Sequence, residues 1–105
     1  MKAYPKLSLR YPFEITEVSG SCVALGVEEG ADAWHGIIKL KNESAVFLFR
    51  KLQEGTCFPD LIQDCMTEFH DSEEGVRPVV TDFLDLMNKN GILLVDEKLV
   101  KVVAE

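Results

Sequence analysis

The early part of the chain alternates apolar and polar residues, which is the spacing of a strand with one buried face. Phe13 to Val18 follows this pattern, and the turn residues Ser19-Gly20-Ser21 separate it from a second apolar run, Cys22 to Val27. Two such runs joined by a turn predict an antiparallel hairpin. Residues 1–12 contain two prolines, which interrupt helices and central strands, so this segment is predicted to be an extended arm.

A third strand is predicted from Trp34 to Lys41. Ile38 and Leu40 fall on one face of this strand, and Lys39 falls with Lys41 on the other, because successive side chains of a strand point to opposite faces. The apolar pair is therefore expected to face the core, and the two lysines are expected to face water.

Two helical segments follow the strands. Asn42 is predicted to cap the first helix, because its side-chain oxygen accepts from a backbone N–H of the first turn. This helix, Ala45 to Leu52, is apolar on nearly every side and is predicted to be the central buried helix, with Gly55 at its C-terminal stop. Pro59 suits the first turn of the second helix. The apolar face of that helix contains Leu61, Ile62, Cys65, Met66 and Phe69.

A third helix is predicted to begin at Pro78, after the polar segment His70 to Gly75. Gly91 suits its end, because glycine tolerates a positive φ angle. Ile92 to Val95 and Leu99 to Val103 then flank a polar tripeptide and predict a C-terminal hairpin. The apolar stripe of the helix has the spacing i, i+3, i+4, i+7 and consists of Val80, Phe83, Leu84 and Met87, widened by Val79 and Leu86.

The order of these elements predicts an α+β fold that is winged helix-turn-helix-like. It comprises a small N-terminal three-stranded antiparallel sheet, a three-helix bundle and a C-terminal β-hairpin. The 105 residues fit a single domain, 1–105, and the 47% hydrophobic content supports a folded core. This arrangement occurs in proteins that bind DNA and in proteins that bind peptides, so the charge of the chain helps to choose between them.

Charge and hydropathy narrow the possible partners. The net charge is −7, from 18 acidic and 11 basic residues, which disfavours nucleic acid and anionic membranes because both require clustered Lys and Arg. No apolar run approaches the roughly 20 residues that span a bilayer, and no signal peptide is recognisable. Three cysteines without a CxxC pair are interpreted as free thiols. Together these features predict a cytoplasmic protein.

No catalytic constellation or cofactor-binding motif is recognisable in the sequence. Cys65 and His70 are separated by roughly one helical turn, but they match no zinc or triad spacing. Asp60, Asp64 and Glu68 recur at every fourth position and are interpreted as a solvated helix face rather than a metal site. The expectation is a noncatalytic protein without cofactor or metal.

Several short segments between Trp34 and Val95 follow one another in a recurrent order: a strand ending in Asn, small residues opening a helix, a Gly-Thr break, two further helices, and a Gly followed by apolar residues. They are Asn42, Ser44-Ala45, Gly55-Thr56, Leu61-Ile62, Thr81-Asp82-Phe83-Leu84 and Asn90-Gly91-Ile92-Leu93. In this order the chain resembles the PqqD-like family, named after the pyrroloquinoline quinone biosynthesis protein D and also known as RiPP recognition elements. The chain departs from the family pattern at Lys41, where the family has Leu, and at Pro59.

The resemblance implies a domain that recognises the leader of a ribosomally made precursor peptide and presents it to a maturation enzyme such as a radical SAM protein. In the family the leader adds as an extra strand to the third strand of the sheet, in a cleft closed by the third helix. These elements correspond to Gly36 to Lys41 and Val79 to Asn88. The peptide-binding residues so implied are Gly36, Ile37, Ile38, Lys39, Leu40, Lys41, Val80, Phe83, Leu84 and Met87.

Strand addition is also reasonable on physical grounds, because an exposed edge strand presents unpaired N–H and C=O groups to an extended peptide. Lys39 and Lys41 are expected to pair with carboxylates of the leader. The same edge is able to pair with a second copy of the chain, which would form a homodimer. The alternative interpretation of the stripe on the third helix is that its residues belong to the core.

The main alternative function is a winged-helix transcriptional regulator that binds DNA. Its reading helix requires basic residues aimed at phosphates, but the third helix has Asp82 and Asp85 between Arg77 and Lys89. Two carboxylates on a reading helix are repelled by DNA. An enzyme is disfavoured because no nucleophile or general base has a recognisable partner.

Overall fold

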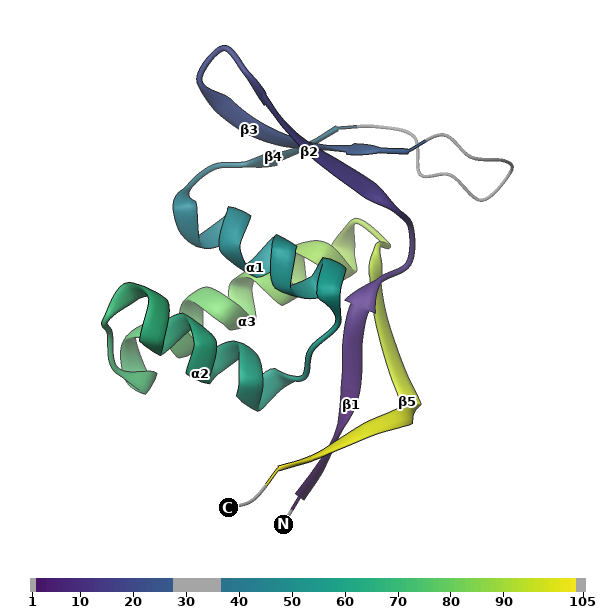
Figure 1. Ribbon diagram of the computed structural model, residues 1–105, viewed down its shortest axis with the longest axis vertical. Coiled ribbons are helices and arrows are strands. Elements are labelled where there is room, and N and C mark those ends of the chain that lie inside the picture. Colours follow the sequence, from purple (N-terminus) through teal and green to yellow (C-terminus); the bar gives the residue numbers. More distant parts are fainter. Residues whose placement is uncertain (1, 28–36, 104–105) are drawn as a thin grey trace.

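The computed structural model describes residues 2–27 and 37–103 (Figure 1). A sheet lies at one end, three helices pack below it, and a two-stranded ribbon extends to the opposite end. The elements in chain order are β1 (Lys2–Leu9), β2 (Phe13–Val18), β3 (Ser21–Gly26), β4 (Ile37–Leu40), α1 (Glu43–Glu54), α2 (Phe58–Phe69), α3 (Glu73–Lys89) and β5 (Leu93–Val103).

The sheet at the end of the molecule is antiparallel and has the strand order β2-β3-β4. Ser19 and Gly20 connect β2 to β3 with φ angles of 52° and 80°, and two positive φ angles are typical of a type I′ hairpin turn. In β4, Ile38 and Leu40 are buried. The predicted three-stranded antiparallel sheet is confirmed, and the part of its third strand before Ile37 lies outside the described residues.

The predicted caps of the first helix and the predicted place of Pro59 in the second are confirmed. The Asn42 Oδ1 accepts from the Ala45 N–H at 2.8 Å and caps α1. Gly55 ends α1 with a φ of 92°, and its N–H donates to two carbonyls of the last turn. α2 begins at Phe58, with Pro59 in its first turn. There the missing N–H of proline leaves no hydrogen bond of the helix unmade.

The predicted start of the third helix at Pro78 is wrong, because α3 begins at Glu73. Ser72 caps it, with its Oγ accepting from the Gly75 N–H at 3.2 Å. The two acidic residues of the first turn stabilise the helix, because their negative charges lie at the positive end of the helix dipole. Pro78 lies inside the helix in an exposed position, where water solvates the carbonyl that lacks an N–H partner.

The predicted C-terminal hairpin is not formed. Leu93 to Val103 is a single strand, and its partner is β1 from the N-terminal arm. The register shifts between Pro5, which is opposite Val100, and Lys6, which is opposite Asp96. The polar tripeptide expected to turn therefore falls at a bulge. It contains no glycine, which is common in tight hairpin turns.

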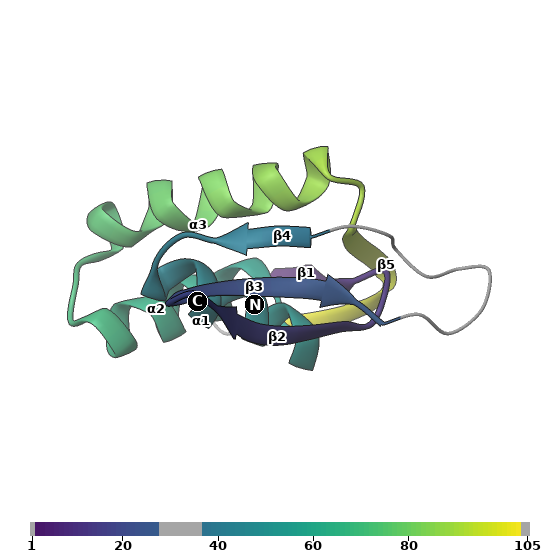
Figure 2. The ribbon, with the colours of Figure 1, turned by 90° about the horizontal axis from the view of Figure 1, so that it is seen from above.

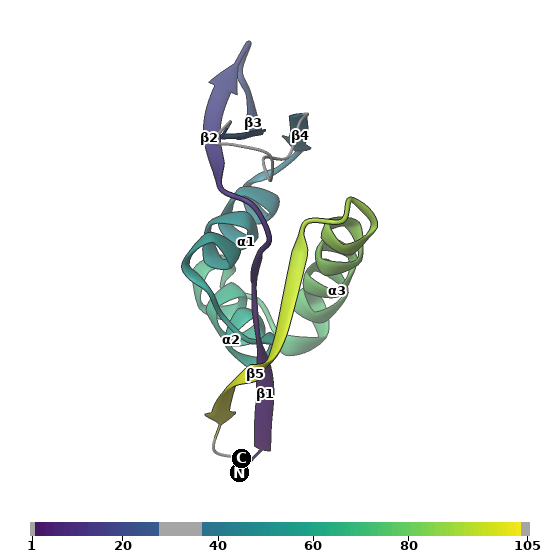
Figure 3. The ribbon, with the colours of Figure 1, turned by 90° about the vertical axis from the view of Figure 1, so that its right-hand side faces the viewer.

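The core lies where the helices meet the sheet and the ribbon (Figure 3). Leu48, Phe49 and Leu52 of α1 are fully buried, so the prediction of a central buried helix is confirmed. Phe13 of β2 packs edge-to-face on Phe49, with 5.4 Å between the ring centroids. Leu7 of β1 is also part of the core. The helices therefore hold both the sheet and the ribbon.

Candidate functional site

One edge of β4 faces no other strand among the described residues, because β4 lies at the end of the order β2-β3-β4. The N-terminal arm, β1, is paired with β5 rather than with β4. The C-terminal strand lies in that same ribbon. Neither β1 nor β5 therefore occupies the edge of β4.

The hydrogen-bond pattern of the sheet determines which backbone groups face this edge. In a two-residue hairpin the residues that flank the turn form a hydrogen-bonded pair, and such pairs recur at every second residue. The Val27 N–H donates to the Pro12 carbonyl at 3.1 Å, in agreement with this alternation along β2 and β3. Cys22 and Ala24 therefore direct their backbone groups away from β2 and towards β4.

Ile38 and Leu40 lie opposite these β3 residues, so their N–H and C=O groups pair with β3. The alternation directs the N–H and C=O groups of Ile37 and Lys39 to the other side, which is the open edge. The side chains of Ile37 and Lys39 are exposed. The edge therefore offers the donors and acceptors that an added strand requires.

A groove lies between β4 and α3, which run beside each other (Figure 2). Its cavity volume is about 330 Å³. Phe83 and Met87 are buried members of its lining, whereas Val79 and Leu86 are 41% and 47% exposed. Apolar side chains as exposed as these two are available to a ligand. The other lining residues are Lys39, Leu40, Lys41, Asn42, Ser44, Ala45, Leu48 and Asp82.

The structure separates the predicted peptide-binding residues into groups. Those that line the groove are Lys39, Leu40, Lys41, Phe83 and Met87. Ile38 and Val80 belong to the buried core, and Leu84 packs against it in a half-buried position. Ile37 is exposed beside the edge, and Gly36 lies outside the described residues. The interpretation of the helix stripe as core therefore holds for Val80, Phe83 and Met87, which are all buried members of the core.

Three groove residues, Val79, Asp82 and Leu86, are not among the predicted site residues. They share the face of α3 that includes Phe83, with the spacing i, i+3, i+4, i+7. The sequence signal for this face is the widening of the apolar stripe by Val79 and Leu86. A stripe wider than the core needs leaves apolar side chains for another surface.

The charges at the groove differ between its two sides. Lys39 and Lys41 belong to the strand side, and Asp82 belongs to the helix side. Both lysines are exposed, and neither forms an ion pair with another described residue. Exposed ion pairs typically contribute about 0.2–1 kcal/mol. The lysines are therefore suited to set the register of an acidic ligand rather than its affinity.

The thiol of Cys65 and the acidic face of α2 are the other groups that the sequence offers for chemistry. Burial raises the pKa of the Cys65 thiol above its ordinary value of 9.0, and the charge of Asp71 acts in the same direction. Such a thiol is protonated at neutral pH and is a poor nucleophile. His70 ends α2, and Asp64 pairs with Lys51 at 3.7 Å. No group of three or more His, Cys, Asp or Glu among the described residues is placed to hold a metal ion.

Fold and groove together define a small α+β protein with an open sheet edge beside an apolar helix face. Comparisons of the chain with protein-family models, with curated proteins and with solved structures find no match. Within residues 2–27 and 37–103, no helix has the length and apolar character needed to cross a membrane. Function is therefore inferred from the geometry around β4 and from the order of the sequence motifs.

Proposed function

We propose that this chain is a noncatalytic peptide-binding protein of the PqqD-like type. It binds the leader of a ribosomally made precursor peptide as an additional strand on β4 and presents the peptide to a maturation enzyme such as a radical SAM protein. The observation that carries this proposal is the open edge of β4 beside the groove of α3. The motifs between Trp34 and Val95 support the class of ligand.

The geometry of the edge defines how the peptide lies. Backbone groups of the added strand pair with those of Ile37 and Lys39, and its side chains alternate between two faces. Side chains on the face of Lys39 meet its ammonium group. Side chains on the opposite face enter the groove beside Val79 and Leu86. The favoured ligand therefore alternates acidic and apolar residues over a segment comparable to β4, which has four residues.

The DNA-binding alternative is less well supported by the charges of α3. Asp82 and Asp85 are exposed, and exposed carboxylates repel phosphates. Arg77 lies 3.4 Å from the carboxylate of Glu73 and 5.7 Å from the ring centroid of Phe58. The nearby carboxylate of Glu73 offsets the positive charge of this exposed side chain. Peptide binding is therefore favoured over DNA binding.

The proposal is tested with fluorescently labelled leader peptides from short genes adjacent to the gene of this chain and with a display library of random dodecapeptides. The folded protein is expected to bind at least one leader saturably, as measured by fluorescence anisotropy. It is also expected to enrich library peptides that alternate apolar and acidic residues. A folded protein that binds no leader and enriches no sequence contradicts the proposal.

A further inference from the structure

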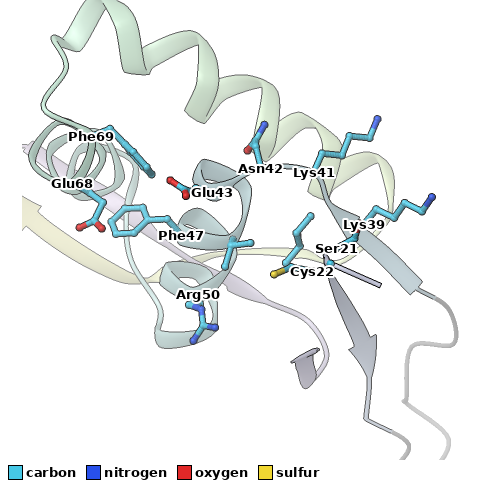
Figure 4. A pocket seen from close by; sticks show the side chains of 13 residues that line it. Ser21, Cys22, Lys39, Lys41, Asn42, Glu43, Phe47, Arg50, Glu68 and Phe69 are labelled. Carbon is cyan, nitrogen blue, oxygen red and sulfur yellow. The ribbon is translucent and has the colours of Figure 1, made fainter. Parts of the chain in front are cut away.

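A second and larger cavity adjoins the other side of the segment that links β4 to α1 (Figure 4). Its volume is about 700 Å³. It is bounded by the start of β3, by one face of α1 and by the end of α2. Neither the resemblance nor the strand-addition proposal assigns a role to this cavity.

The cavity has an apolar centre formed by two helices. Phe47 of α1 and Phe69 of α2 meet edge-to-face, with 5.6 Å between their ring centroids. Both rings and the nearby Val46 are half-buried and line the cavity. The Lys51 ammonium lies 5.4 Å from the Phe47 centroid but is not part of the lining. The aromatic pair therefore retains surface that an apolar side chain is able to cover.

This cavity and the groove beside β4 lie against different faces of α1 and share one part of their lining. Lys39, Leu40, Lys41 and Asn42 line both of them. All strand pairs among the described residues are antiparallel, and antiparallel pairing is slightly the more stable per residue. A peptide antiparallel to β4 has its N-terminal side near Asn42, so the residues that precede its paired segment lie next to the lining that the two cavities share.

The charged residues of the cavity bear on the charge of the peptide residues that would bind there. Lys39, Lys41 and Arg50 outnumber Glu43 and Glu68 in the lining, although the chain as a whole has a net charge of −7. Figure 4 shows Lys39 and Lys41 pointing away from the aromatic pair, with Glu43 close to it and Arg50 on a separate side.

A negative side chain is repelled near Glu43 and Glu68 and attracted near Arg50. Arg50 is exposed and forms no hydrogen bond or ion pair with another described residue. Its guanidinium is therefore available to a ligand carboxylate.

We propose that the second cavity binds the residues that precede the strand-paired segment of the peptide. One large apolar side chain covers Phe47 and Phe69, and an acidic side chain further upstream meets Arg50. This inference rests on the proposed function, because the strand on β4 delivers the flank to the cavity. It defines the ligand as a strand-forming core with an upstream apolar and acidic flank.

The test extends a dodecapeptide selected by the protein with a randomised hexapeptide at its N-terminus, in a display library. A matched library carries the same extension at the C-terminus. The expected result is enrichment of a large apolar residue and an upstream acidic residue in the N-terminal extension. Enrichment of neither residue type there, with the core peptide still bound, overturns this inference and leaves strand addition intact. Failure of the core peptide itself to bind overturns both proposals.

Two variants test whether the extension binds at the aromatic pair and at Arg50. Phe47→Ala is expected to lower the affinity for the best extended peptide roughly tenfold, because it removes the aromatic surface that the apolar side chain covers. Arg50→Gln is expected to lower it roughly two- to fivefold, the effect of an exposed ion pair. Neither variant is expected to change the affinity for the unextended core peptide.

Arg77→Gln is the matched control, because it makes the same chemical change on α3 outside both cavities. Thermal unfolding establishes that each variant is folded. If Phe47→Ala does not fold, the affinity of Arg50→Gln for the extended peptide alone tests the proposal. An Arg50→Gln variant that binds the extended peptide as tightly as wild type overturns the assignment of the acidic flank.

Discussion

Leu7 and Thr56 exchange two backbone hydrogen bonds. The Leu7 N–H donates to the Thr56 carbonyl at 2.6 Å, and the Thr56 N–H donates to the Leu7 carbonyl at 2.9 Å. Thr56 lies in the connection between α1 and α2, so this bridge fixes β1 against the helices. Because β1 also pairs with β5, the arm is held in the ribbon and does not pair with β4.

The first prediction concerns this anchor. Leu7→Ala is expected to lower the free energy of unfolding by about 2–5 kcal/mol, because it empties a buried leucine site. Urea unfolding followed by circular dichroism measures the change. Ser8→Ala in the same strand is the control and is expected to stay within roughly 0.5 kcal/mol of wild type. Equal stability of the two variants would show that the Leu7 side chain does not anchor the ribbon.

Amide hydrogen exchange is expected to report the direction of each backbone group in β4. The Ile38 and Leu40 amides pair with β3 and are expected to exchange slowly in the free protein. The Ile37 and Lys39 amides face the open edge and are expected to exchange quickly until a peptide binds. The measurement is exchange by NMR with and without a selected dodecapeptide. Unchanged exchange at Lys39 under saturation contradicts strand addition.

Proline substitution tests the same groups by mutation. Lys39→Pro removes an edge-facing N–H without breaking the β3 ladder, so peptide affinity is expected to fall about tenfold with the fold retained. Ile38→Pro removes an N–H that pairs with β3 and is expected to destabilise the sheet itself. Lys39→Ala is the control for the side chain, because it keeps the backbone N–H and removes the side chain beyond Cβ together with its charge. Equal affinities of Lys39→Pro and Lys39→Ala would exclude a role for this donor.

The buried thiol predicts a dependence of stability on pH. Because burial raises the pKa of Cys65 above 9.0 in the folded protein, the folded state holds its proton at a pH where the unfolded thiol loses it. The contribution of Cys65 to stability is therefore complete below the unfolded pKa and decreases as pH rises above it. The difference in unfolding free energy between wild type and Cys65→Ala, measured under reducing conditions, is expected to shrink from about pH 8 to pH 10. A difference that is constant or grows over this range contradicts the prediction.

Local patterns account for the elements that the sequence predicts correctly. Alternation marks β2 and β4, and an apolar run after a turn marks β3. Asn42 and Gly55 mark the ends of α1, because each acts through neighbouring backbone groups. Pro78 misleads because proline is more common in the first turn of a helix than inside it. In α3 the cap at Ser72 and the acidic first turn determine the start instead.

Long-range pairing accounts for what the sequence does not reveal. Nothing in the alternation of β5 states whether its partner is adjacent or at the other end of the chain, and β1 provides the partner. Pro5 is tolerated in β1 because the register shifts directly after it. The lining of the groove also depends on contacts between elements that are distant in the sequence. Whether Val80 or Val79 faces the core depends on the rotation of α3 against its neighbours, which no local pattern determines.

The last prediction separates the groove from the core on α3. Leu86→Ser changes an exposed side chain, so the free energy of unfolding is expected to stay within roughly 0.5 kcal/mol of wild type. Peptide affinity is expected to fall several-fold, because the apolar side chains of the ligand lose a contact in the groove. Val18→Ser is the matched control, since Val18 is also exposed but lies at the end of β2, away from the groove. Stability is measured by urea unfolding and affinity by anisotropy with the same labelled dodecapeptide. If Leu86→Ser and Val18→Ser bind equally well, the peptide does not contact α3, and the strand on β4 lacks the apolar wall that the proposal requires.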